Sequence, residues 1–278
     1  MPPYRYLLGD AGTEAERLRA QARLWDPTAL ALFDRLGVRR GWNVLEIGPG
    51  QGSLHVELRR RTRRPVDAVE PSPAFRRRLA ALCARDRFGS GTIWKTPLAE
   101  TKLPDARYDL IFARWVFLFL PNPGTHVKKL AAALKPGGML AIEDYHRDTF
   151  VMVPTPREWP AFLHADHAFF ASQGGDASIA GRLPDLYRQA GLSLVEITPT
   201  IKTGHPGSPM WNWISTYFFG VMDRLAAFPP FAPAAAARLR KHWRAAARNR
   251  ASLLIAPAVI DVVGRRPHTR ASGHRPQA

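Results

Sequence analysis

The stretch Val44-Leu45-Glu46-Ile47-Gly48-Pro49-Gly50-Gln51-Gly52-Ser53-Leu54 decides the fold of this 278-residue chain. Its apolar start predicts a short buried strand, and a helical pattern of apolar residues follows its last glycine. Glycines between a strand and a helix let the backbone pass close to a ligand, because no Cβ stands in the way. The N-terminus of the following helix offers unpaired N–H groups to a polar ligand group. The stretch therefore predicts a Rossmann-type turn.

Strand and helix patterns alternate on either side of this turn. We expect strands over 43–47, 66–70, 92–95, 108–113, 139–145, 192–201 and 252–264. Helices are expected over 53–61, 72–85, 123–134, 179–190 and 233–250, and two helices joined at Pro27 are expected over 11–36. Strands separated by helices of this length favour a parallel sheet that is covered on both faces. The sequence thus predicts an α/β protein.

Two acids near the glycine turn indicate which ligand it binds. The dinucleotide fingerprint requires Gly or Ala where this chain has Ser53. Glu46, two residues before the first glycine, suits an ammonium group better than a pyrophosphate. Glu70 ends the second predicted strand, where an acid can accept both ribose hydroxyls. The glycine turn and the two acids together suit a ligand with an amino-acid end and an unphosphorylated ribose.

These residues carry a resemblance to a known family. The run Glu46-Ile47-Gly48-Pro49-Gly50-Gln51-Gly52 resembles motif I of class I S-adenosylmethionine-dependent methyltransferases, and Glu70 matches the acid of their second strand. Phe119-Leu120-Pro121 and Lys135-Pro136-Gly137-Gly138-Met139-Leu140 are similar to the stretches after the fourth and before the fifth strand of that family. Tyr6-Leu7-Leu8-Gly9, Glu16-Arg17-Leu18-Arg19-Ala20-Gln21 and Gly264-Arg265-Arg266-Pro267 are similar to its small-molecule, ubiquinone/menaquinone methyltransferase-like subgroup. Close resemblance covers residues 40–145.

The resemblance implies a fold and a division of the chain. The implied fold is α/β: a Rossmann-like doubly wound seven-stranded sheet with the last strand antiparallel, plus inserted helices. We expect an N-terminal helical segment at 1–40 and a cofactor-binding core at 41–146. Substrate-cover helices and the completion of the sheet follow at 147–263, and a flexible tail at 264–278. The cover is expected because aromatic residues gather in two stretches outside the alternating pattern; packing in the core is the alternative.

The resemblance also implies that the chain uses S-adenosylmethionine, and which residues bind it. The implied set is Glu46, Gly48, Gly50, Gly52, Glu70, Pro71, Leu98, Ala113, Arg114 and Trp115. The chain departs from the family at Pro97, where many members carry an Asp beside the adenine. Because Pro97 cannot accept the adenine amino proton, the backbone N–H of Leu98 is expected to meet the ring. For Arg114 and Trp115, packing without ligand contact is the alternative.

Candidate catalytic residues lie at the carboxyl end of the fifth predicted strand. Asp144 or His146 can take a proton from an attacking hydroxyl or amine, and Asp144 can instead cap or pair with an Arg. A sulfonium is an excellent leaving group, so alignment and water exclusion are the main tasks and a base is optional. His164 and His167 share a helix face but lack a third ligand, so no metal site is expected.

The formal charge of +17 bears on partners. Solvated helix faces in an Arg-rich chain are the plain interpretation, and a basic surface that attracts an acidic ligand is the alternative. An aromatic cover and basic charge together indicate a small-molecule substrate of acidic or aromatic character. The other hypotheses are an RNA or other nucleic-acid methyltransferase and a non-catalytic partner protein with the same fold. No membrane span or secretory signal is evident, so a cytoplasmic protein is expected. Oligomeric state and pathway are not indicated.

Overall fold

The computed structural model describes residues 12–85 and 87–268, which form two sheets flanked by helices. The helices are α1 (Gly12–Arg35), α2 (Ser53–Thr62), α3 (Pro73–Cys83), α4 (Pro123–Ala133), α5 (Trp159–Ser172), α6 (Leu183–Gln189), α7 (Pro209–Leu225) and α8 (Pro233–Ala246). The strands are β1 (Val44–Ile47), β2 (Asp67–Val69), β3 (Ile93–Trp94), β4 (Tyr108–Arg114), β5 (Leu134–His146), β6 (Val151–Val153), β7 (Ser193–Thr200), β8 (Thr203–Gly204), β9 (Leu253–Ile255) and β10 (Ala258–Arg265). Short 3₁₀ turns lie at Phe117–Phe119, Arg147–Thr149 and Ile179–Arg182.

The large sheet has seven strands in the order β3-β2-β1-β4-β5-β10-β7. The first five strands in this order are parallel to one another, whereas β10 runs antiparallel to both β5 and β7. The predicted Rossmann-like sheet with its last strand antiparallel is therefore confirmed. In such a sheet the ligand crevice lies outside the carboxyl ends of the strands, where the strand order reverses. Here the order reverses between β1 and β4.

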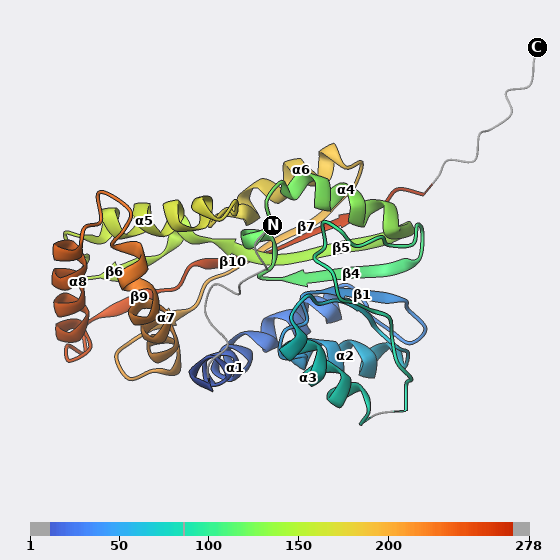
Figure 1. Ribbon diagram of the computed structural model, residues 1–278, viewed down its shortest axis with the longest axis horizontal. Coiled ribbons are helices and arrows are strands. Elements are labelled where there is room, and N and C mark those ends of the chain that lie inside the picture. The colour runs from blue at the N-terminus through green and yellow to red at the C-terminus, as the bar shows by residue number, and fades with distance from the viewer. Residues whose placement is uncertain (1–11, 86, 269–278) are drawn as a thin grey trace, which may run out of the picture.

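Helices cover both faces of this sheet, and a cap closes one end (Figure 1). Helices α1, α2 and α3 lie on one side and α4 and α6 on the other, while α5, α7 and α8 gather at the end toward which β5 runs. The second sheet, in the order β6-β9-β8, belongs to this cap. The cap therefore stands over the carboxyl ends of the central strands, where a ligand is expected.

The N-terminal segment differs from its prediction. Two helices joined at Pro27 were expected, but α1 is one continuous helix with Pro27 inside it. A proline removes one backbone hydrogen bond from a helix. The neighbouring Trp25, Ala29 and Leu32 are all fully buried, and this apolar packing outweighs that loss.

The predicted final strand over 252–264 is also different in the structure. It is two strands, since β9 and β10 are separated at Ala256-Pro257 and join different sheets. Pro257 has no N–H to donate to a ladder, which is a physical reason for the break. The last strand also runs beyond the expected start of the tail, through Gly264 and Arg265, and Arg266 donates to the carbonyl oxygens of Ala132 and Leu134. The remainder of the expected tail, 269–278, and residues 1–11 lie outside the described residues.

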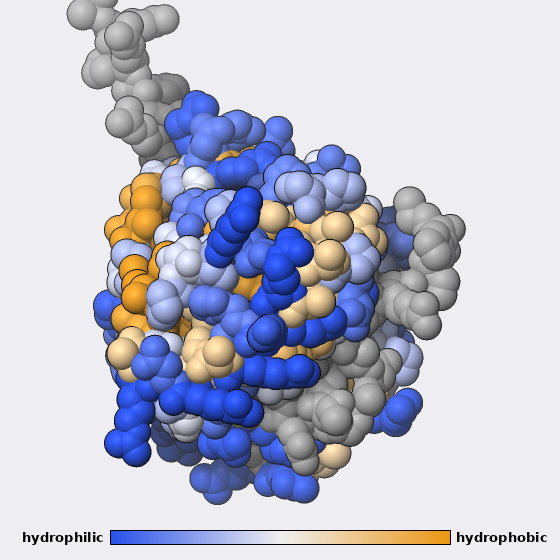
Figure 2. Space-filling view, turned by 90° about the vertical axis from the view of Figure 1, so that its left-hand side faces the viewer, coloured by the Kyte–Doolittle hydropathy of each residue, from blue (hydrophilic) through white to orange (hydrophobic). Residues whose placement is uncertain are grey.

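The cap turns its aromatic side chains inward. Trp159, Trp213, Phe218 and Trp243 are nearly or completely buried, whereas the end of the molecule formed by the cap is mostly hydrophilic in the view of Figure 2. Among the described residues, no helix is both long and apolar enough to cross a membrane. The aromatic stretches thus build an interior, and a pocket opens within it.

Candidate functional site

The glycine turn between β1 and α2 leaves space for a ligand. Gly48 and Gly50 have φ angles of 66° and 52°, which side chains rarely adopt. A Cβ on Gly48 would lie 2.7 Å from Cγ2 of Val116, so this glycine lets the turn touch the segment after β4. A Cβ on Gly50 would have no atom nearer than 4.0 Å. Gly50 therefore faces open space in the crevice, where a ligand can approach the backbone.

Glu70, at the end of β2, closes one side of this space. The side chain is almost completely buried, and its two carboxylate oxygens accept hydrogen bonds from the backbone N–H groups of Gly50, at 3.3 Å, and Ser72, at 2.8 Å. Burial raises the pKa of Glu70 to about 7, although these backbone hydrogen bonds oppose the shift. The carboxyl group thus changes charge near neutral pH and lies directly on the glycine turn.

Glu46 has a partner that the sequence did not reveal. Its carboxylate lies 3.0 Å from Nδ1 of His55, and both side chains are buried. Burial alone lowers the pKa of His55, but the neighbouring Cys83 thiol and the Glu46 carboxylate raise it to about 9. His55 is therefore a cation at neutral pH and neutralises part of the charge that Glu46 presents to the turn.

Several basic side chains hold the loops of the crevice in place. Arg76 donates to the carbonyl oxygens of Glu70, at 3.1 Å, and Pro71, at 2.6 Å, and Arg78 donates to the carbonyl of Gln51. Lys129 donates to three carbonyls of the loop after β3, including that of the buried Leu98 at 2.7 Å. The sequence did not indicate that these residues bind loop carbonyls, because their partners are backbone oxygens.

The predicted residues at the end of β4 lie beside the turn. Ala113 is fully buried and pairs with Ile47 of β1. Arg114 forms an ion pair with Asp26 of α1, and its guanidinium lies 4.6 Å from the centre of the Trp115 ring. Trp115 has a φ of 53°, an unusual backbone conformation for a bulky residue. Strain of this kind concentrates at functional sites.

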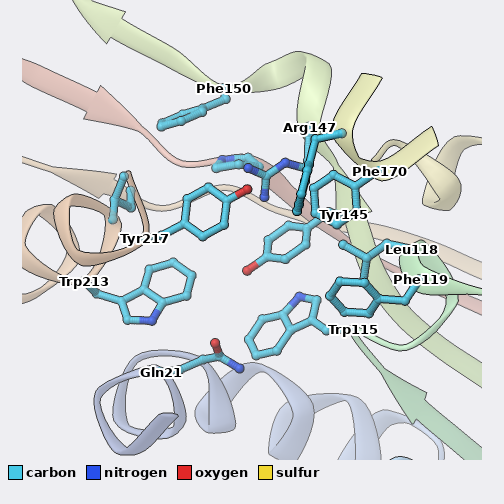
Figure 3. Close-up of a pocket in the computed structure, with 13 residues that line it drawn as sticks. Gln21, Trp115, Leu118, Phe119, Tyr145, Arg147, Phe150, Phe170, Trp213 and Tyr217 are labelled. Atoms are coloured by element: carbon cyan, nitrogen blue, oxygen red, sulfur yellow. The ribbon is translucent and has the colours of Figure 1, made fainter. Parts of the chain in front are cut away.

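An aromatic pocket opens next to this segment, beneath the cap (Figure 3). It has about 740 Å³ of empty space, counted with its opening to solvent. The residues that line it are Gln21, Trp115, Leu118, Phe119, Tyr145, Arg147, Phe150, Phe169, Phe170, Trp213, Ile214, Tyr217 and Pro257. Figure 3 shows the rings around a common space, with the hydroxyl groups of Tyr145 and Tyr217 directed toward its middle. Apolar, concave sites lined by aromatic side chains bind small molecules.

Arg147 lies inside this pocket and is fully paired with an acid. Its guanidinium donates to both carboxylate oxygens of Asp166, at 2.6 and 3.0 Å, and Tyr217 donates to the same carboxylate at 2.8 Å. Burial alone would lower the pKa of Arg147, but Asp166 beside it raises that pKa. The pair is thus a permanent, buried ion pair in the pocket wall.

The two predicted catalytic residues do not line the pocket in the part of the chain that the structure describes. Asp144 is completely buried and accepts hydrogen bonds from the backbone N–H groups of Tyr145, at 2.8 Å, and Leu118, at 3.2 Å. Burial raises its pKa to about 7, against these hydrogen bonds. His146 packs against Gly181, and its Nε2 lies 3.8 Å from Asp148. The predicted role of either residue as a base stays a prediction. Among the described residues, no three His, Cys, Asp or Glu side chains are arranged to hold a metal ion.

The chain also matches a known protein family. A family described as a methyltransferase domain matches residues 16–197, which is more than half of the chain. The chain belongs to the methyltransferase family. Methyltransferase GfsG from Streptomyces halstedii is 29% identical to this chain over 184 residues, a match that covers 64% of the chain and 62% of GfsG. The chain spans about three fifths or less of the length of the curated relatives it matches.

Solved structures have the same fold. A putative methyltransferase from Bacillus halodurans C-125 has a TM-score of 0.61 at 16% identity, over 86% of this chain and 99% of that one. Phosphoethanolamine N-methyltransferase 2 from Haemonchus contortus, in complex with S-adenosyl-L-methionine, has a TM-score of 0.53 at 15% identity, over 88% of this chain and 53% of that one. Identities this low establish the fold alone, and they identify neither the substrate nor the cofactor of this chain.

Proposed function

We propose that the chain binds S-adenosylmethionine in the crevice of the glycine turn and transfers its methyl group to a small molecule in the aromatic pocket. The carrying observation is the contact between the two sites: the turn at Gly48 lies against Val116, and the preceding residue, Trp115, is part of the pocket wall. A ligand in the crevice and a ligand in the pocket would therefore lie next to one another.

The residues present fit this cofactor. The open space at Gly50 admits a nucleoside, and the Glu70 carboxylate on the turn can accept from two ribose hydroxyls. Glu46 supplies an acid at the opposite end for an ammonium group, shared with His55. In the predicted set, Pro71 and Leu98 lie in the loops that Arg76 and Lys129 hold, and Leu98 is expected on the adenine side. S-adenosylmethionine supplies an electrophilic methyl group on a sulfonium.

The chain's own contribution is alignment and exclusion of water. Asp144 fixes the segment after β4 against β5 by accepting from Leu118, and so positions the pocket wall. We therefore propose Asp144 as a positioning residue. The cap covers the aromatic pocket and so limits the access of bulk water to the reacting methyl group. The predicted link to the ubiquinone/menaquinone methyltransferase-like subgroup rests partly on Tyr6 to Gly9, outside the described residues.

A small-molecule substrate is better supported than nucleic acid. Some of the arginines that raise the net charge form ion pairs with acids of the same chain, for example Arg61 with Glu57 and Asp34, and Arg240 with Asp223. The pocket is built from rings and admits a compact apolar ligand. This supports the proposal of a small-molecule methyltransferase over one that acts on RNA.

Isothermal titration with S-adenosylmethionine and S-adenosylhomocysteine tests the proposal. Glu70→Ala and Gly50→Leu are each expected to weaken both ligands at least 100-fold, because they remove the ribose acceptor and fill the crevice. Asp185→Ala removes an exposed carboxylate of α6, and Gly37→Leu adds a side chain at a φ of 66° with no atom within 4 Å. Both controls should bind normally. Unchanged affinity in Glu70→Ala and Gly50→Leu would contradict the cofactor assignment.

A further inference from the structure

We propose that the aromatic pocket selects a neutral, planar, ring-containing substrate and discriminates against both acids and amines. This inference rests on the proposed function for its place next to the methyl donor, and it names the substrate class. It narrows the expectation from the sequence, in which net positive charge indicated an acidic ligand as well as an aromatic one.

Rings dominate the pocket wall. Eight of the thirteen described lining residues are aromatic: Trp115, Phe119, Tyr145, Phe150, Phe169, Phe170, Trp213 and Tyr217. They come from the segment after β4, from β5 and the segment after it, and from α5 and α7 of the cap. The rings labelled in Figure 3 surround the space. Aromatic side chains bind flat rings through stacked and edge-to-face contacts. A planar ligand is therefore the best match to the shape and chemistry of this wall.

An acid finds no available charge in the pocket. Among the described lining residues Arg147 alone is charged, and both oxygens of Asp166 already accept from it. The side chains of the two residues are 7% and 1% exposed, so the pair is shielded from water. A ligand carboxylate would have to displace Asp166 or lie beside it. Either arrangement leaves a buried negative charge without its partner, which is strongly unfavourable.

An amine also finds that five of the eight rings already hold a guanidinium of the protein. Cations bind over the faces of aromatic rings, but the protein's own guanidinium of Arg147 lies 5.6, 5.4 and 4.8 Å from the ring centres of Tyr145, Phe170 and Tyr217. Arg114 covers Trp115 in the same way, at 4.6 Å, and Arg224 covers Phe169 at 5.6 Å. A ligand ammonium placed over one of these rings would therefore have to share the ring with a guanidinium of the protein. A neutral molecule avoids both penalties.

Three naphthalene probes that differ in charge test the inference. They are 2-acetylnaphthalene (neutral), 2-naphthoate (anionic) and 2-naphthylmethylammonium (cationic), each titrated into the full chain by calorimetry, with and without S-adenosylhomocysteine. The neutral probe is expected to bind at least tenfold more tightly than either charged one. Equal or tighter binding of 2-naphthoate or of the ammonium probe would overturn the inference, as would no binding of any of the three.

An Asp166→Asn variant tests the physical reason. Removal of this carboxylate leaves Arg147 unpaired, so 2-naphthoate is expected to gain at least tenfold in affinity while 2-acetylnaphthalene changes less than threefold. Asp185→Asn, in an exposed ion pair of α6, is the matched control and should leave all three affinities unchanged. No gain for 2-naphthoate in a cooperatively folded Asp166→Asn protein would refute the role of the ion pair. If that variant does not fold, the ranking of the probes on the unsubstituted chain decides.

The outcomes separate this inference from the proposed function. Absence of S-adenosylhomocysteine binding, with 2-acetylnaphthalene still bound most tightly, would contradict the methyl-transfer proposal and support the proposed selectivity of the pocket. Normal S-adenosylhomocysteine binding, with 2-naphthoate bound most tightly, would support the cofactor assignment and contradict the proposed selectivity of the pocket.

Discussion

The cofactor crevice and the aromatic pocket lie side by side at the carboxyl ends of the central strands, but the chain builds them differently. The crevice comes from two short stretches, the turn after β1 and the end of β2, in which Gly48, Gly50 and Glu70 act through local backbone geometry. The pocket takes side chains from α1, the segment after β4, β5, α5 and α7. The comparison teaches that the crevice needs few residues, close together in the chain, whereas the pocket wall depends on long-range packing.

The largest expected effect concerns the pocket. Arg147→Met leaves Asp166 buried without its cation, and breaking such a pair costs roughly 3–5 kcal/mol of unfolding free energy. Since Asp166 lies on the pocket side, the affinity for S-adenosylhomocysteine should change less than threefold. Chemical denaturation and calorimetry measure the two quantities. In the double variant Arg147→Met/Asp166→Leu much of the lost stability should return. A double variant no more stable than Arg147→Met would show that the ion pair is not the cause.

The next effect concerns the contact between the two regions. Gly48→Val combines an unfavourable φ with a clash against Val116, and should cost about 2–4 kcal/mol of stability. The displaced turn should also abolish detectable binding of S-adenosylhomocysteine. Gly207→Val has a similar φ, 83°, but no atom within 4 Å of the new Cβ. It isolates backbone strain and should cost about 1 kcal/mol with normal binding. Equal effects of the two variants would show that the contact with Val116 is unimportant.

The smallest expected effect is a pH dependence confined to the crevice. Because the pKa of Glu70 is raised to about 7, its carboxylate form increases from pH 6 to pH 8, and S-adenosylhomocysteine should bind about tenfold more tightly at pH 8. For the ligand-free protein the sign is opposite. A raised carboxyl pKa contributes stability below its unfolded value of 4.5, and this contribution is lost as pH rises through about 7.

Titrations from pH 6 to pH 8 with the unsubstituted chain and Glu70→Gln separate these effects. The variant should lose the pH dependence of ligand binding and bind weakly throughout. A tenfold change that persists in Glu70→Gln would assign the dependence to another group, such as Asp144, whose pKa is also raised to about 7. The neutral naphthalene probe should bind equally at both pH values, which completes the contrast between crevice and pocket.

Prediction from the sequence worked best where a residue's role is local. The strand-turn-helix unit around Gly48 was predicted because glycine spacing and apolar runs are visible without tertiary contacts. The parallel sheet followed from alternating patterns, and the antiparallel last strand from the resemblance to a known family. The continuity of α1 through Pro27 was not predictable in this way, since it depends on packing of Trp25 and Ala29. The split of the last strand at Pro257 had a signal, because proline cannot donate in a ladder.

By itself, the sequence determined the class of fold and predicted the glycine turn and the acid at Glu70 as a binding crevice, because these depend on backbone conformation and on residues near one another in the chain. Only the tertiary structure decided that Arg147 is neutralised by Asp166, that His55 accompanies Glu46, and that Arg76 and Lys129 hold loop carbonyls. In each case the charge of one residue is set by a partner on another element. Composition gave the sum of the charges, but folding decided which of them a ligand can meet.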